Sequence, residues 1–120
     1  MKAVKINLID ETRKELIAAE VIEANTFFNK LFGLITRRRL RDREGFLIKN
    51  CSSIHTFWMR YSIDVVFLDK NNQVLAIYYD LKPFRATPFI KNAFFVLELK
   101  SGTIEKTSLK PGDLISFEAL

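Results

Sequence analysis

The sequence predicts a mostly β, α+β domain, in which about seven strands form a small closed or strongly curved β-barrel with one covering helix and one short helix. Three observations predict it. The chain has 120 residues, of which 48% are hydrophobic, enough for the core of one domain. Stretches with strand-like alternation recur along the chain, and only one long stretch has helical spacing. We therefore expect a single globular domain over residues 1–120.

The N-terminal third contains two expected strands and the covering helix. Residues 2–10 alternate between apolar and polar side chains, as a half-buried strand does. Residues 15–22 form a second expected strand, although residues 16–19 could also be helical. Asn25 is a favourable N-cap, and the apolar residues over 27–35 recur at the spacing of one helical face.

The remainder of the chain has β character. Residues 55–69 form one long bent strand or two, and the turn chemistry of residues 69–72 predicts a hairpin. A long loop with two prolines, a short helix over 103–108 and a type II turn over 110–113 are expected after it. The further expected strands are 45–49, 73–80, 93–100 and 114–118.

Several classes of protein and site are excluded by simple counts. The single Cys rules out a disulfide framework, and no apolar run approaches the roughly 20 residues that span a bilayer. The N-terminus lacks the apolar core of a signal peptide, so we expect a cytoplasmic protein. One Cys and one His supply too few ligands for zinc, and no phosphate-binding or hydrolase motif occurs. We expect no cofactor and no metal.

The positive charge is concentrated in one stretch. Between Lys30 and Arg43 there are six basic residues and one acidic residue, which accounts for the whole net charge of +5. This basic stretch is either a solvated loop or a contact for nucleic acid or an acidic partner. Its arginines are Arg37, Arg38, Arg39, Arg41 and Arg43.

The stretch from His55 to Asp69, HTFWMRYSIDVVFLD, resembles the motif of the prokaryotic domain-of-unknown-function family 192. Four shorter pieces agree in order: GLITR from Gly33, EGFL from Glu44, VLELKSGT from Val96 and LKPGD from Leu109. The resemblance covers nearly the whole chain, from Ile17 to Phe117. It implies a compact, mostly β, barrel-like fold with a helix, and it implies no reaction.

The same motif contains the candidate site. In an extended strand, Thr56, Trp58 and Arg60 share one face, and an indole beside a guanidinium suits carboxylates, phosphates or sugar rings. Phe84 and Arg85 in the long loop could wall a cleft with them. The alternative is structural, with Trp58 in the core and Arg60 paired with Asp64.

We therefore expect a small non-catalytic binding module for an anionic, sugar-like or peptide ligand. One alternative is an interaction protein acting through the basic stretch. The other is an enzyme in which Asp64 or His55 acts as acid or base, because Asp64 lies in an apolar strand and His55 is the only histidine. The candidate site residues are His55, Thr56, Trp58, Arg60, Asp64, Phe84 and Arg85.

Overall fold

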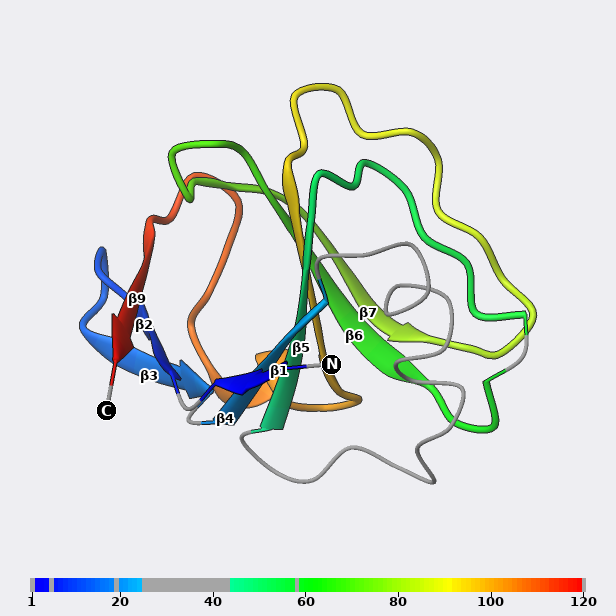
Figure 1. Ribbon diagram of the computed structural model, residues 1–120, viewed down its shortest axis with the longest axis horizontal. Coiled ribbons are helices and arrows are strands. Elements are labelled where there is room, and N and C mark those ends of the chain that lie inside the picture. Colours follow the sequence, from blue (N-terminus) through cyan, green and yellow to red (C-terminus); the bar gives the residue numbers. More distant parts are fainter. Residues whose placement is uncertain (1, 5, 19, 25–43, 58, 120) are drawn as a thin grey trace.

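The computed structural model of the protein describes residues 2–4, 6–18, 20–24, 44–57 and 59–119. Within these residues the chain forms nine strands and one 3-10 turn (Figure 1). They are β1 (Lys2–Val4), β2 (Ile6–Asp10), β3 (Glu15–Ala18), β4 (Glu20–Ala24), β5 (Glu44–Lys49), β6 (Ile63–Leu68), β7 (Val74–Leu81), β8 (Phe95–Lys100), η1 (Ile104–Lys106) and β9 (Ile115–Ala119).

The strands are arranged in two open sheets. A six-stranded sheet has the order β1-β4-β5-β8-β6-β7, and a three-stranded sheet has the order β3-β2-β9 (Figure 1). The β4–β5 pair is parallel, and the other pairs of neighbouring strands are antiparallel. The N-terminal chain crosses from the larger sheet to the smaller and back, since β1 and β4 belong to the larger sheet and β2 and β3 to the smaller.

Two groups of apolar side chains cover the two faces of the six-stranded sheet. The inner core draws on both sheets and consists of Leu8, Ile17, Ala18, Val21, Leu47, Val66, Leu68, Val74, Leu97, Leu99, Ile104, Leu109 and Ile115. The outer core lies on the opposite face and consists of Phe46, Ile48, Met59, Ile63, Val65, Phe67 and Val96. Because β6 is covered on both faces, all six of its residues are buried.

The expected barrel is wrong, and within the described residues the fold is all-β instead of α+β. The edge strands of the larger sheet, β1 and β7, are not paired with each other, so this sheet stays open. Alternation specifies which residues form strands and which face they bury, but not whether the sheet closes. No α-helix occurs within the described ranges, and residues 27–35, where the covering helix was expected, lie outside them. The helix expected over 103–108 is only the 3-10 turn η1, with i to i+3 bonds.

The turns expected from local chemistry are confirmed. Asp69 Oδ1 accepts the N–H groups of Asn71 (2.8 Å) and Gln73 (3.0 Å) at the β6–β7 hairpin. The Asp113 N–H donates to the Lys110 carbonyl (3.1 Å), and Gly112 has the positive φ of 95° that a type II turn requires.

Within the described residues, no helix is long and apolar enough to cross a membrane.

Candidate functional site

Most of the expected site residues lie on two neighbouring loops. Loop A covers residues 51–62, between β5 and β6, and loop B covers residues 82–94, between β7 and β8. A single β-bridge joins His55 to Ala86. Beside it the Thr87 N–H donates to the Ile54 carbonyl (2.9 Å), and the Ile54 N–H donates to Thr87 Oγ1 (3.0 Å). The two loops are therefore held side by side by several hydrogen bonds.

Thr56 is the central contact between the loops. Its fully buried hydroxyl donates to the Lys82 carbonyl (2.6 Å) and accepts the Arg85 N–H (3.0 Å). Its own N–H donates to the Arg85 carbonyl (2.8 Å), and its carbonyl accepts the N–H groups of Phe84 (3.0 Å) and Met59 (3.2 Å). One buried threonine thus fixes the backbone of both loops, and we call this arrangement the Thr56 clamp.

The clamp presents aromatic side chains to solvent. Phe84 is 66% exposed, and its φ of 61° places a bulky residue in the left-handed region. Such a conformation costs roughly 1–3 kcal/mol unless the surroundings enforce it. Phe57 on loop A is 43% exposed, and its ring stacks on the His55 imidazole at 4.8 Å between ring centroids.

The two loops also carry a marked excess of positive charge. Neither stretch contains Asp or Glu, whereas together they contain four basic residues: Arg60, Lys82, Arg85 and Lys91. Lys82 forms an ion pair with the neighbouring Asp80. The Arg60 and Arg85 side chains are exposed, and Arg85 donates one hydrogen bond to the Phe84 carbonyl. This surface favours anions.

The structure places the expected site residues differently from a continuous strand. The hydrogen bonds between the two loops bring together four of the expected residues: His55, Thr56, Phe84 and Arg85. Residues 55–62 do not continue β6, because Thr56 bonds to loop B and the chain turns between Thr56 and Met59. The expected alternation of faces therefore fails here. Arg60 lies further along loop A, and Trp58 lies outside the described residues, as do Arg37, Arg38, Arg39, Arg41 and Arg43.

Asp64 is buried on β6, and its carboxylate is occupied by backbone donors. Its Oδ1 accepts the Asp80 N–H (2.8 Å) and its Oδ2 accepts the Ile104 N–H (3.0 Å). These bonds join β7 and η1 to the centre of the larger sheet. Asp64 therefore has a structural role that accounts for both of its oxygens.

A second buried acid, Glu98 on β8, was missed by sequence reasoning. It is only 5% exposed, and within the described part of the chain it has no hydrogen bond or ion pair. Burial raises the pKa of Glu98 to about 8. The signal that could have found it is an acid between Leu97 and Leu99 in an apolar strand.

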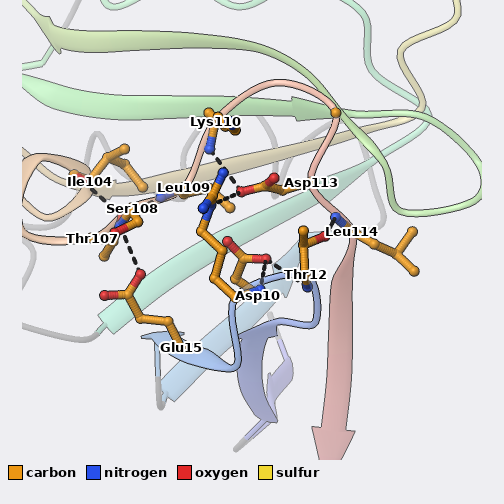
Figure 2. A network of polar contacts seen from close by, with 12 residues as sticks. Asp10, Thr12, Glu15, Ile104, Thr107, Ser108, Leu109, Lys110, Asp113 and Leu114 are labelled. Carbon is orange, nitrogen blue, oxygen red and sulfur yellow. Dashed lines mark hydrogen bonds and ion pairs between the residues drawn. The ribbon is translucent and has the colours of Figure 1, made fainter.

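A third group of acids lies at the other end of the molecule, where Asp10 ends β2 and Asp113 precedes β9 (Figure 2). Burial, and then the hydrogen bond with Asp113, raise the pKa of Asp10. Burial also acts to raise the pKa of Asp113, but hydrogen bonds from Asp10, the Lys110 N–H and Arg13 outweigh it and lower that pKa. Arg13 connects the two acids, because its backbone N–H donates to Asp10 Oδ1 (3.2 Å) and its guanidinium donates to Asp113 Oδ2 (3.1 Å). Among the described residues, no three His, Cys, Asp or Glu side chains are grouped to hold a metal ion.

Solved structures with the same fold confirm the architecture. A protein of unknown function from Novosphingobium aromaticivorans superimposes with a TM-score of 0.80 at 20% identity, over 95% of this chain and 84% of the other. A putative transcription regulator from Sinorhizobium meliloti superimposes with a TM-score of 0.81 at 20% identity, over 97% and 94%. At this identity the likeness establishes the fold alone.

Two relatives similar in sequence carry the same family name. A UPF0127 protein of Thermococcus sibiricus is 31% identical over 118 residues, covering 92% of this chain and 74% of the relative. A UPF0127 protein of Pyrococcus furiosus is 29% identical over 117 residues, covering 94% and 99%. The family DUF192, described as "Uncharacterized ACR", matches residues 7–117. The chain therefore belongs to the DUF192 family, as its motifs predict, and this family has no established function.

Proposed function

We propose that the protein is a small binding module whose exposed loop A–loop B surface takes a ligand combining a negative charge with an aromatic or apolar group. The observation that carries the proposal is Phe84, an exposed ring held in the left-handed backbone region by the Thr56 clamp. A phenylalanine is a poor choice for such a position, because glycine or asparagine would relieve the strain. An exposed ring at a backbone cost is typical of a contact surface rather than of packing.

The charge of the loops supports an anionic ligand. Four basic residues and no acid lie on loops A and B, so an anion meets no repulsion from them. Arg60 and Arg85 provide guanidinium groups, whose forked donors match carboxylate and phosphate oxygens. Aromatic rings nearby add a contact for a ring or an apolar group.

The clamp supports binding by a preformed site. Its hydrogen bonds fix Phe84 and Arg85 before any ligand arrives, so little ordering of the backbone remains to be done on binding. Asp64 does not support an acid–base function, because two backbone donors occupy its oxygens.

Calorimetric titration with phenyl phosphate, inorganic phosphate and phenol tests the proposal, since these probes separate ring from charge. We expect phenyl phosphate to bind more tightly than either of the others. Arg85→Gln and Arg60→Ala should each weaken phenyl phosphate about tenfold, the loss of one charge-assisted contact. Lys110→Gln, which removes an exposed cation outside the two loops, is the matched control and should leave binding unchanged.

Phe84→Gly provides a sharper signature. It should abolish the preference for phenyl phosphate over inorganic phosphate while raising the midpoint of thermal unfolding, because glycine relieves the positive φ. The proposal would be overturned if Phe84→Gly bound phenyl phosphate as tightly as the natural chain does. Equal losses of affinity in Arg85→Gln and Lys110→Gln would also overturn it.

A further inference from the structure

Glu98 lies on the face of the six-stranded sheet against which side chains of loops A and B pack. Strand alternation places it on the outer face of the six-stranded sheet, together with Val96. It is directly opposite Phe46 on β5 and Val65 on β6, and both are members of the outer core. A carboxyl group at the centre of this apolar face has no polar neighbour in the strand register.

The same outer face is where the site loops dock. Met59 of loop A is a buried member of the outer core, and further side chains from both loops pack against it: Cys51, Ile54, Tyr61, Ile90 and Ala93. A charge on Glu98 would be taken out of water, and no described residue donates a hydrogen bond to its carboxylate or forms an ion pair with it. The loops can therefore pack on the face at low cost only while Glu98 is neutral.

We infer that docking of loops A and B on the six-stranded sheet is linked to protonation of Glu98, so that proton release from this residue loosens the site. The loosened loops would then bind the ligand more weakly, and this consequence rests on the proposed function. The docked loops hold the neutral acid, whereas open loops expose it to water, where it ionises readily. The high pKa of Glu98, caused by burial, agrees with this difference.

Other titratable groups share this face and could contribute to pH dependence. Alternation places one acid on β5 and one base on β8 beside Glu98, and the outer core adds a thiol and two phenols from loop A and β7. They are Glu44, Lys100, Cys51, Tyr61 and Tyr78. A test must therefore separate Glu98 from these groups by substitution.

The sign of the linkage follows from the two pKa values of Glu98, an ordinary 4.5 when exposed and about 8 when buried. Below both values the docked and open states bind the same proton, and docking is strongest. Between them only the docked state keeps the proton, so the opening constant rises about tenfold per pH unit. Above about 8 both states are ionised and the opening constant levels off.

Amide hydrogen exchange of residues 51–62, expressed as protection factors at each pH, measures this opening. We expect protection in the natural chain to fall about tenfold per pH unit between pH 5 and 8, and then to stop falling. Glu98→Gln keeps the size of the side chain without the charge, so its protection should not change with pH. Glu105→Gln, at an exposed glutamate of η1, should behave like the natural chain.

Two results would overturn the inference: protection in the natural chain that does not depend on pH, or the same slope in Glu98→Gln. A carbon-13 NMR titration of the Glu98 carboxyl in the natural chain keeps the test valid if the variant does not fold, and an ordinary pKa there would also overturn it. Adding phenyl phosphate separates the two proposals. If it leaves the protection factors unchanged at every pH while the Glu98-dependent slope remains, the proposed function fails and the linkage stands.

Discussion

Replacing Asp64 by asparagine should destabilise the protein far more than the same replacement at Asp69. Asp64 uses both oxygens, one for the Asp80 N–H and one for the Ile104 N–H, and it is buried. An asparagine has only one acceptor oxygen, so one backbone N–H would face an amide N–H₂ group. Asp69 accepts both of its hydrogen bonds at Oδ1, and an amide oxygen can replace it.

The expected size follows from these bonds. Losing a hydrogen bond to a charged acceptor costs about 1.5–3 kcal/mol, and a buried donor left unsatisfied adds about 1–3 kcal/mol. We therefore expect Asp64→Asn to lower the free energy of unfolding by roughly 3–5 kcal/mol. For a chain of this length, about 1 kcal/mol corresponds to about 4 °C, so the midpoint should fall by about 12–20 °C. Asp69→Asn should stay within about 1 kcal/mol.

Urea unfolding and thermal unfolding of both variants measure these differences. The reasoning would be refuted if the two substitutions lowered stability equally, or if Asp64→Asn unfolded like the natural chain. The latter result would also reopen the alternative in which Asp64 serves chemistry instead of structure, because a residue that stabilises nothing must be explained by function.

Three further predictions concern the other contacts. The pKa of Asp10 is raised by burial and by the neighbouring Asp113. Its contribution to the free energy of unfolding is therefore fully present below its unfolded-state pKa and is lost as pH rises through its folded-state pKa. Asp113, whose folded-state pKa is lowered, stabilises the folded protein above its unfolded-state pKa, and this stabilisation is lost as pH falls through its folded-state pKa. Asp10→Asn cannot ionise, so its free energy of unfolding in urea, relative to the natural chain, should rise as pH increases from 3.8 to the raised folded pKa of Asp10 and then level off; a difference that does not depend on pH contradicts the raised pKa. Thr56→Val should cost about 2–4 kcal/mol, since two buried loop contacts lose their partner, whereas Thr56→Ser should cost about 1 kcal/mol or less; equal losses in the two variants would contradict a role carried by the hydroxyl. Gly112→Ala should cost about 1 kcal/mol through its φ of 95° alone, because an added Cβ meets no atom within 4 Å; a much larger loss by thermal unfolding would show an unsuspected clash.

The turns were predicted correctly, because residues close together in the sequence determine them. The hairpin at Asp69 and the turn at Gly112 are as expected, because a side-chain oxygen and a glycine each act within a few residues. The stretches 2–10 and 15–22 were each expected to form one strand, but each is shared between two sheets. Which sheet a strand joins depends on partners far along the chain, and alternation contains no such information.

The candidate site was predicted in part for the same reason. Phe84 and Arg85 were expected beside Trp58 and Arg60, because a long loop near a distinctive motif is often functional. They contact Thr56 of that motif, Arg60 lies further along loop A, and Trp58 lies outside the described residues. The extended form of residues 55–62 was not found, since Thr56 makes its hydrogen bonds to loop B. β-branched and aromatic residues favour a strand only when a neighbouring strand is free to pair with it.

The two buried acids of the six-stranded sheet show what sequence reasoning cannot predict. Asp64 and Glu98 both lie between apolar residues of a central strand, and the sequence alone gives no ground for treating them differently. In the fold they lie on opposite faces of the six-stranded sheet. Asp64 is opposite Leu99 on the inner face, where η1 and β7 offer two N–H groups, and so its charge is compensated. Glu98 is opposite Val65 on the outer face, where no described residue donates a hydrogen bond to it, and we infer that it keeps its proton while the loops stay docked. Two residues of the same chemistry thus acquire opposite roles because the side of the sheet decides whether a donor is within reach.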